Sequence, residues 1–398
     1  MEQERGKSGQ LFHGFLIAGI ALLTGLVLDA VFPPLSGLIP QFPINLIILV
    51  ILVSLIVILA VVLRKSRTYA FMASVRAAVP ALSLFVLLVI LMGLIPQSFS
   101  GEASFLNSIR SSWTFYLSGL FLLIVLIFAT GKYLKRFNLR NAGFVLNHLG
   151  IAVILLAAAV KQSDYHKYSM TLRMDQPVWY ASDHQGNLHD LDFALEMKAF
   201  TLDYHPPLLE IKTPENKTLS LVEISSSDTG QIVKYKDLKL RILSYLPEAS
   251  ISGDAYVPYS GMNAVPAVEF RLSEDENASD SSIWVGAGNQ FFPKRTYRQQ
   301  QFIIELKNRM PRQYTTRARL YKKEGESRNV RIQVNKPAEI NGWKVYQQSY
   351  DQRKGTYSDI SVLSLVKDPW LPLMYFGIFM LMAGIVLMFV RGKPKSVL

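Results

Sequence analysis

His148 is the ionisable side chain that lies well inside an apolar segment, residues 142–160. An ionisable group in hydrocarbon is costly, so it indicates a function such as metal ligation or proton relay. On a helix Asn141, Phe144 and His148 share one face, which sets an aromatic ring beside the imidazole. We interpret Asn141, Phe144 and His148 as a candidate binding site in which a neutral imidazole is the metal ligand. The alternative is a structural histidine, hydrogen-bonded between helices.

Other candidate ligands lie in a polar segment. His184 and His189 are five positions apart and are flanked by Asp183 and Asp190, a spacing that could chelate a metal ion. A turn rich in Asp, Asn and Gly is the simpler interpretation. The chain has no cysteine, which excludes thiol exchange and thiolate metal sites. The common hydrolase, zinc-protease and nucleotide-binding motifs are also missing from the sequence.

Six apolar segments are long enough to cross a bilayer as helices. The sequence predicts them at residues 11–32, 44–63, 78–95, 113–130, 142–160 and 371–390. The first is too long for a signal peptide and lacks a small-residue cleavage site, so we expect it to remain as an anchor. His148 then lies about eight residues past Arg140, roughly 12 Å along the helix axis.

The distribution of charge indicates how these helices are oriented. With a cytoplasmic N-terminus, every Lys and Arg outside the long polar block except Arg110 falls on the cytoplasmic side. This predicts two N-terminal spans in residues 1–63, three more in 64–160, an extracytoplasmic domain in 161–368, and a last span with a basic cytoplasmic tail in 369–398. Both termini are then cytoplasmic.

The same distribution excludes nucleic acid as a partner. The formal net charge is +12, but residues 161–368 contain 28 Lys and Arg against 26 Asp and Glu, a net charge of only +2. A local basic run extends from Lys294 to Lys323. It is typical of a solvated strand face, or of a surface for lipid headgroups, heme propionates or an acidic partner.

Short segments with alternating polarity predict strands in the polar block. They lie at residues 238–246, 282–286, 301–307, 317–322, 329–334, 343–350 and 360–366. We expect a mostly antiparallel, sandwich-like β domain, which makes the chain an α+β membrane protein with six transmembrane helices.

Several aromatic residues have two interpretations. Trp113 and Trp370 flank apolar segments, as residues at the membrane–water interface do. Trp343, Tyr346 and Tyr350 lie along one expected strand, where alternate residues more often pack a core than form an exposed ledge for a ligand.

Seven short motifs occur in the order, and on the topology, of a known family. They are Gly93-Leu-Ile-Pro-Gln97, Ser112-Trp-Thr-Phe-Tyr116, His148-Leu-Gly150, Leu191-Asp-Phe-Ala-Leu195 with Asp203-Tyr-His-Pro-Pro207, Arg331-Ile-Gln-Val-Asn-Lys-Pro337, Asn341-Gly-Trp-Lys-Val-Tyr-Gln-Gln-Ser-Tyr-Asp351 and Lys367-Asp-Pro-Trp-Leu-Pro-Leu373. Over residues 75–390 the chain resembles the ResB (CcsB) family of system II cytochrome c biogenesis. The two N-terminal spans exceed that family's minimal plan.

The resemblance implies a cofactor and partners. Members of the family work in the bacterial cytoplasmic membrane with a CcsA (ResC) partner, and together they carry heme b across the membrane for attachment to apocytochrome c. The family's histidine in the helix that enters the external domain is implicated as a heme ligand, and His148 falls at that position. The partner's tryptophan-rich heme motif is missing here, so the resemblance implies a separate subunit, non-catalytic alone, of a heme lyase complex.

Two functions from different classes follow. In the first, the chain takes heme at a site that includes His148 and presents it, with its partner, to apocytochrome c. In the second, it is a scaffold that binds apocytochrome or stabilises the partner without ligating heme. A solute transporter is disfavoured, because the sequence shows no inverted repeats or broken helices.

Overall fold

The computed structural model divides the chain into two compact units. One comprises Met1–His166 with Lys367–Leu398, and the other comprises Lys167–Val366. The structure describes residues 2–97, 105–134, 138, 141–236, 238–273 and 282–391. Arg140 and the basic tail after Arg391 therefore lie outside the described residues.

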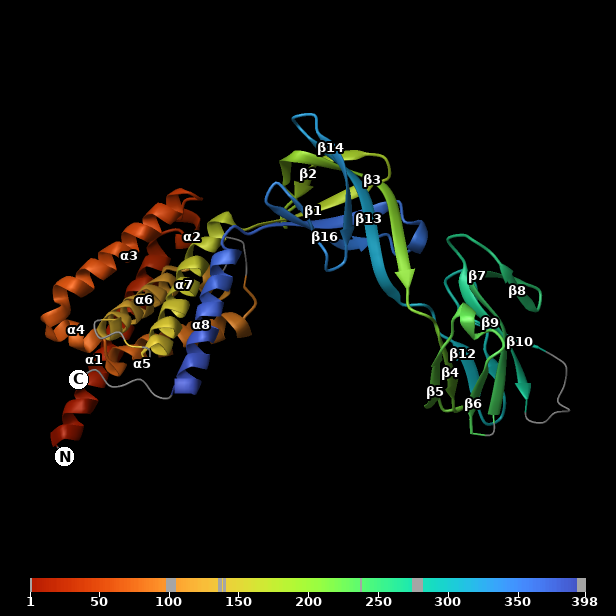
Figure 1. The fold of residues 1–398 in the computed structure, drawn as a ribbon, viewed down its shortest axis with the longest axis horizontal. Helices are drawn as coiled ribbons and strands as arrows, with labels where there is room; N and C mark the ends of the chain where they lie inside the picture. The colour runs from red at the N-terminus through yellow and green to blue at the C-terminus, as the bar shows by residue number, and fades with distance from the viewer. Residues whose placement is uncertain are drawn as a thin grey trace. The chain divides into compact units, whose positions relative to one another are not determined.

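The first unit is a bundle of helices (Figure 1). Its helices are α1 (Glu2–Val31), α2 (Leu35–Leu38), α3 (Ile44–Val62), α4 (Arg67–Met72), α5 (Val75–Leu94), α6 (Trp113–Leu134), α7 (Ala142–Asp164) and α8 (Leu371–Arg391). All except α2 and α4 provide a segment long and apolar enough to cross a membrane. The six predicted spans are thus confirmed, with ends that shift by a few residues, and the protein is a multi-pass membrane protein.

The N-terminal helix α1 packs against α5 and α6. Gly25 allows the close approach, because a Cβ there would lie 2.5 Å from Thr114 Cα. Asp29 then accepts hydrogen bonds from the Trp113 N–H at 2.6 Å and from the Thr114 hydroxyl at 2.7 Å. A carboxylate at a helix N-terminus satisfies free N–H groups and the helix dipole. Helix α1 is therefore an integral part of the bundle.

The second unit contains an eight-stranded antiparallel sheet in the order β14-β13-β3-β2-β1-β17-β16-β15 (Figure 1). Its strands are β1 (His166–Arg173), β2 (Pro177–Ser182), β3 (Leu188–Tyr204), β13 (Pro311–Lys322), β14 (Ser327–Gln333), β15 (Ala338–Ile340), β16 (Trp343–Tyr350) and β17 (Ile360–Lys367). Alternation directs side chains such as Ala318 and Leu320 inward and leaves Arg317 and Arg319 exposed. The sheet curls around its own core, since β14 also contacts β15 and β16 from the other end of the order.

Two smaller antiparallel sheets share a second core. One has the order β10-β9-β7-β6 with β8 on β7, and the other β11-β12-β4-β5. The strands are β4 (Leu208–Lys212), β5 (Thr218–Glu223), β6 (Ile232–Tyr235), β7 (Leu238–Ser252), β8 (Ala255–Pro258), β9 (Val265–Ser273), β10 (Ile283–Gly286), β11 (Tyr297–Arg298) and β12 (Ile303–Leu306). Leu209 and Ile304 of one sheet pack with Ile242 and Phe270 of the other.

The expectation of a mostly antiparallel β region is confirmed. A sandwich describes the two smaller sheets, whereas the eight-stranded sheet encloses its own core. Trp343 lies in that core, and Tyr350 packs against Phe200, with ring centroids 5.2 Å apart. The core interpretation of these two aromatic residues therefore fits the structure better than an exposed ledge.

Candidate functional site

His148 lies on α7, stacked against the aromatic ring one helical turn before it. The centroids of the Phe144 and His148 rings are 3.8 Å apart, and the ring planes make an angle of 26°. The imidazole is half-buried within this chain. The four-residue spacing on one helix face brings these two rings together, as the sequence indicates.

The hydrogen bond of His148 fixes which ring nitrogen is available. Nδ1 lies 3.0 Å from the Phe144 carbonyl oxygen. Because a carbonyl oxygen only accepts, Nδ1 must carry the proton of the neutral ring. Within the described part of the chain, Nε2 has no hydrogen-bond partner. The ring therefore presents an Nε2 lone pair, the form in which imidazole binds metals.

A third ring extends this stack from the neighbouring helix. Tyr133, in the last turn of α6, lies with its ring centroid 4.1 Å from that of Phe144. Sequence reasoning missed Tyr133 because the contact joins two helices across a loop. Its place at the end of an apolar span next to α7 is the only signal the sequence offers.

Glycines hold α7 directly against α8, which lie side by side in Figure 1. A Cβ on Gly150 would lie 2.7 Å from the Gly377 carbonyl oxygen, and a Cβ on Gly143 would lie 2.9 Å from that of Gly384. Gly143 and Gly150 are seven residues apart on α7, and Gly377 and Gly384 are seven residues apart on α8. The glycines of each helix therefore lie on one face. Such glycines let helix backbones approach closely in membranes. The helix that carries His148 thus has a fixed partner in α8.

A carboxylate fixes the other end of α7. Asp164 accepts hydrogen bonds from the Phe42 N–H at 2.9 Å, Asn45 Nδ2 at 2.6 Å and Trp370 Nε1 at 2.6 Å. These donors join α3, α7 and the start of α8. Trp370 is only 6% exposed. This residue, which the sequence placed at the membrane interface, is therefore a buried hydrogen-bond donor.

Asn141 immediately precedes α7 and is buried, with 1% of its surface exposed. Its N–H donates to the Asn138 side-chain oxygen at 2.9 Å. Seven positions separate it from His148, or roughly 10 Å along the axis at 1.5 Å per residue. The structure thus brings Phe144 and His148 into contact and places Asn141 at the start of their helix.

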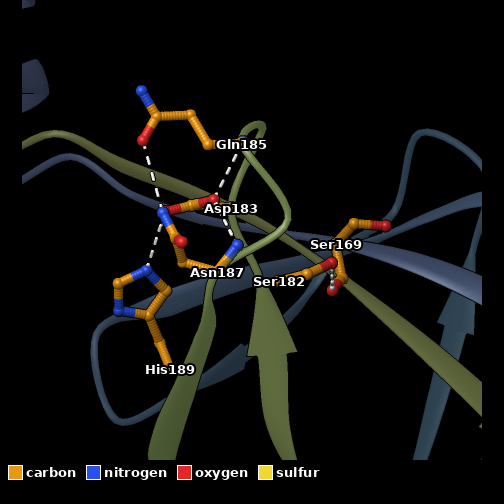
Figure 2. Close-up of polar contacts among 6 residues, drawn as sticks. All are labelled: Ser169, Ser182, Asp183, Gln185, Asn187 and His189. Carbon is orange, nitrogen blue, oxygen red and sulfur yellow. Dashed lines mark hydrogen bonds and ion pairs between the residues drawn. The ribbon is translucent and has the colours of Figure 1, made fainter.

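A second histidine stacked on an aromatic ring, His189, lies at the start of β3, beside the turn that joins β2 to β3 (Figure 2). His189 Nε2 donates to the Asp183 carboxylate at 3.0 Å, and its ring lies parallel to Tyr168 at a centroid distance of 4.5 Å. The same carboxylate accepts the N–H groups of Gln185 and Asn187, each at 2.9 Å. Asp183 therefore organises the whole turn.

These bonds determine the ionisation of Asp183 and bear on the metal interpretation. The hydrogen bond from His189 acts most strongly, and with those from Asn187 and Gln185 it holds the pKa of the Asp183 carboxyl below its ordinary value, against a smaller opposing effect of burial. His184 is exposed in the turn. Among the described residues, no group of three His, Asp or Glu side chains could hold a metal ion. The polar turn is the interpretation that the geometry supports.

Comparison with known proteins identifies one part of the chain. Residues 272–358, about a fifth of the sequence, match the ResB-like family. This segment contains the motifs at 331–337 and 341–351, and His148 lies outside it. No curated protein matches the chain. The protein therefore carries a ResB-like family domain over residues 272–358, which implies a role in system II cytochrome c biogenesis.

Proposed function

We propose that the protein is the ResB-type membrane subunit of a system II cytochrome c biogenesis complex, and that His148 is an axial ligand of the heme b it handles. Its partners are a CcsA (ResC) membrane protein and apocytochrome c. In this arrangement the β unit is extracytoplasmic and both termini are cytoplasmic, in the cytoplasmic membrane of a bacterium. The ResB-like segment supports the pathway, and the geometry of α7 supports the ligand.

The ligand proposal rests on one observation, the hydrogen bond between His148 Nδ1 and the Phe144 carbonyl oxygen. Heme iron takes a neutral imidazole as a ligand, and a hydrogen bond to the other ring nitrogen orients that imidazole. The Phe144 carbonyl supplies this bond to His148 and leaves Nε2 available. The Phe144 ring limits rotation of the imidazole. The residues present therefore fit a heme ligand, and bound heme would supply the iron and the vinyl groups that react with apocytochrome thiols.

A second ligand must come from elsewhere. The chain has six histidines, and the other five lie at or beyond the ends of the spans. An iron with two imidazole ligands would thus take the second from the CcsA-type partner. The lack of cysteine agrees with a subunit that delivers heme and does not itself provide a thiol.

The test is heme retention by the complex purified with its partner. We expect His148→Ala to lose most of the Soret absorbance, and added imidazole to restore it, because the free ligand replaces the missing side chain. His13→Ala is the matched control, since His13 is exposed near the start of the apolar span in α1 and its loss should leave the spectrum unchanged.

The scaffold alternative gives the opposite result. If His148→Ala keeps the heme content and Soret maximum of the wild type while it still assembles with the partner, His148 is structural. The subunit would then act by holding apocytochrome or by stabilising the partner.

A further inference from the structure

A polar cavity of about 440 Å³ lies beside the loop that follows β10. Its lining includes Gly288 and Asn289 of this loop, Lys294, and Lys307 and Asn308 at the end of β12. It therefore lies within the ResB-like segment, and its two lysines belong to the basic run that the sequence singled out. Its volume is in the range of small-molecule sites.

The loop that forms one wall is fixed by its backbone. Gly286 and Arg295 exchange two hydrogen bonds of 3.0 Å, and Asn308 Nδ2 donates to the Gly288 carbonyl at 2.8 Å. A Cβ on Gly288 would lie 2.6 Å from the backbone nitrogen of Lys294, so the wall has no room for a side chain there. The cavity wall is therefore held in place before any ligand arrives.

Two buried carboxylates position the lysines of the cavity. Glu210 and Glu305 are directly opposite on neighbouring strands, an arrangement of like charges that is destabilising by itself. Glu305 Oε2 lies 2.8 Å from both Lys294 Nζ and Lys212 Nζ, and Glu210 Oε2 lies 3.2 Å from Lys307 Nζ. The two carboxylates thus hold three ammonium groups.

The charges of this cluster do not balance. Burial acts to raise the pKa of Glu305, but the hydrogen bonds with Lys212, Lys294 and Glu210 and the charge of Lys294 outweigh it and lower the pKa to about 2, so the group is an anion at neutral pH. Three lysines against two glutamates leave one positive charge. The side chains of Lys294 and Lys307 are 40% and 45% exposed, so their remaining N–H groups can reach a ligand. We infer that this cavity binds a carboxylate between the ammonium groups of Lys294 and Lys307.

Carboxylate is the chemistry these groups recognise, since each ammonium is a strong donor already oriented by a buried acid. The carboxylate can belong to a small organic acid or to a porphyrin propionate. The inference goes beyond the proposed function and does not depend on His148, because the cavity residues belong to the two smaller sheets and their loops.

The experiment is a calorimetric titration of the full chain in lipid nanodiscs with glutarate. We expect saturable binding that weakens by roughly tenfold or more in Lys294→Met/Lys307→Met, because hydrogen bonds to charged groups are lost. Lys294→Arg/Lys307→Arg should bind. Lys322→Met is the matched control, since Lys322 pairs with Glu326 at 2.8 Å in a turn away from the cavity.

A second titration distinguishes a small organic acid from a porphyrin propionate as the source of the carboxylate. Metal-free protoporphyrin should displace glutarate, and its dimethyl ester should not, if the site takes propionates; no displacement by either assigns the site to small acids. Because the porphyrin has no iron, this result is independent of His148. Equal glutarate affinity in the wild type and the double Met variant, or no saturable binding at millimolar concentration, would overturn the inference. If the double variant fails to fold, Lys294→Ala alone must show the loss, since it leaves Glu305 paired with Lys212.

Discussion

One histidine of the helical unit and one of the β unit stack on an aromatic ring. The two use different ring nitrogens for hydrogen bonding. His148 engages Nδ1 with the Phe144 carbonyl, whereas His189 engages Nε2 with the Asp183 carboxylate. Nε2 projects away from the backbone, whereas Nδ1 is bonded to Cγ and lies on the side of the ring nearer the backbone. Of these two histidines, His148 therefore presents the nitrogen that a bulky metal complex can approach.

The chemical character of the two hydrogen-bond acceptors also differs. A backbone carbonyl is neutral and adds no charge to a helix that crosses hydrocarbon. A carboxylate carries a negative charge, and that of Asp183 also accepts the N–H groups of Gln185 and Asn187. A stacked histidine is thus no functional signal by itself, and the position and charge of its partner decide what it can bind.

The largest effect should come from separating α7 from α8. Gly150→Leu places a side chain where the Gly377 carbonyl oxygen lies 2.7 Å from the Cβ position, and neither backbone can yield without parting the helices. We expect a loss of about 3 kcal/mol in the free energy of unfolding of the helical unit. Circular dichroism during unfolding in mixed micelles measures it, and the β unit should be unaffected.

Gly19→Leu is the control for this change. A Cβ on Gly19 meets nothing within 4 Å, so its stability should stay near that of the wild type. Equal unfolding curves for Gly150→Leu and Gly19→Leu would contradict the close contact of α7 and α8.

The next effect concerns the opposite end of α7. Asp164→Asn removes the charge that accepts hydrogen bonds from Phe42, Asn45 and Trp370, and should cost about 2 kcal/mol in the same unfolding experiment. Asp359→Asn is the matched control, because its ion pair with Lys354 at 2.8 Å joins two side chains that are 37% and 49% exposed and should contribute less than about 1 kcal/mol. Comparable losses for the two variants would show that Asp164 is no special anchor.

Local patterns in the sequence predicted the helices and the pairing of Phe144 with His148. Apolar length alone gives the six spans, and the four-residue spacing places the two rings on one face. The same kind of information gives strand positions from residue 238 onward. These features depend only on residues that are near one another in the chain, which is why sequence reasoning found them.

Long-range features could not be predicted. The hydrogen bond between Trp370 and Asp164 joins residues that come before and after the β unit in the sequence. The eight-stranded sheet likewise pairs its first strand, β1, with its last, β17. The nitrogen that His148 uses depends on a side-chain torsion that no spacing specifies. The exposed turn beside His189 has the same residue types as a chelating site. Only the geometry shows that the Asp183 carboxylate accepts hydrogen bonds from the turn and from His189.

A smaller effect tests the stacking against His148. Phe144→Leu keeps an apolar side chain but removes the aromatic face 3.8 Å from the imidazole, so heme affinity of the complex should fall by roughly fivefold. Tyr168→Leu makes the same change beside His189 and should leave heme affinity unchanged. Heme titration followed at the Soret band measures both, and similar losses would show that the two histidines do not differ in function.

The smallest effect is a pH dependence confined to the turn of His189. The hydrogen bond from His189 lowers the pKa of Asp183 in the folded state, so this carboxylate stabilises the fold above its unfolded pKa of about 3.9. That stability is lost as the pH falls from there through the folded pKa, because the unfolded carboxyl takes up its proton first. The thermal midpoint of Asp183→Asn should therefore lie below that of the wild type at neutral pH and converge with it in acid. In a His189→Ala background most of the difference should vanish, whereas heme content should stay that of the wild type throughout. A loss of heme in His189→Ala as large as in His148→Ala would mean that the free nitrogen does not distinguish the two sites.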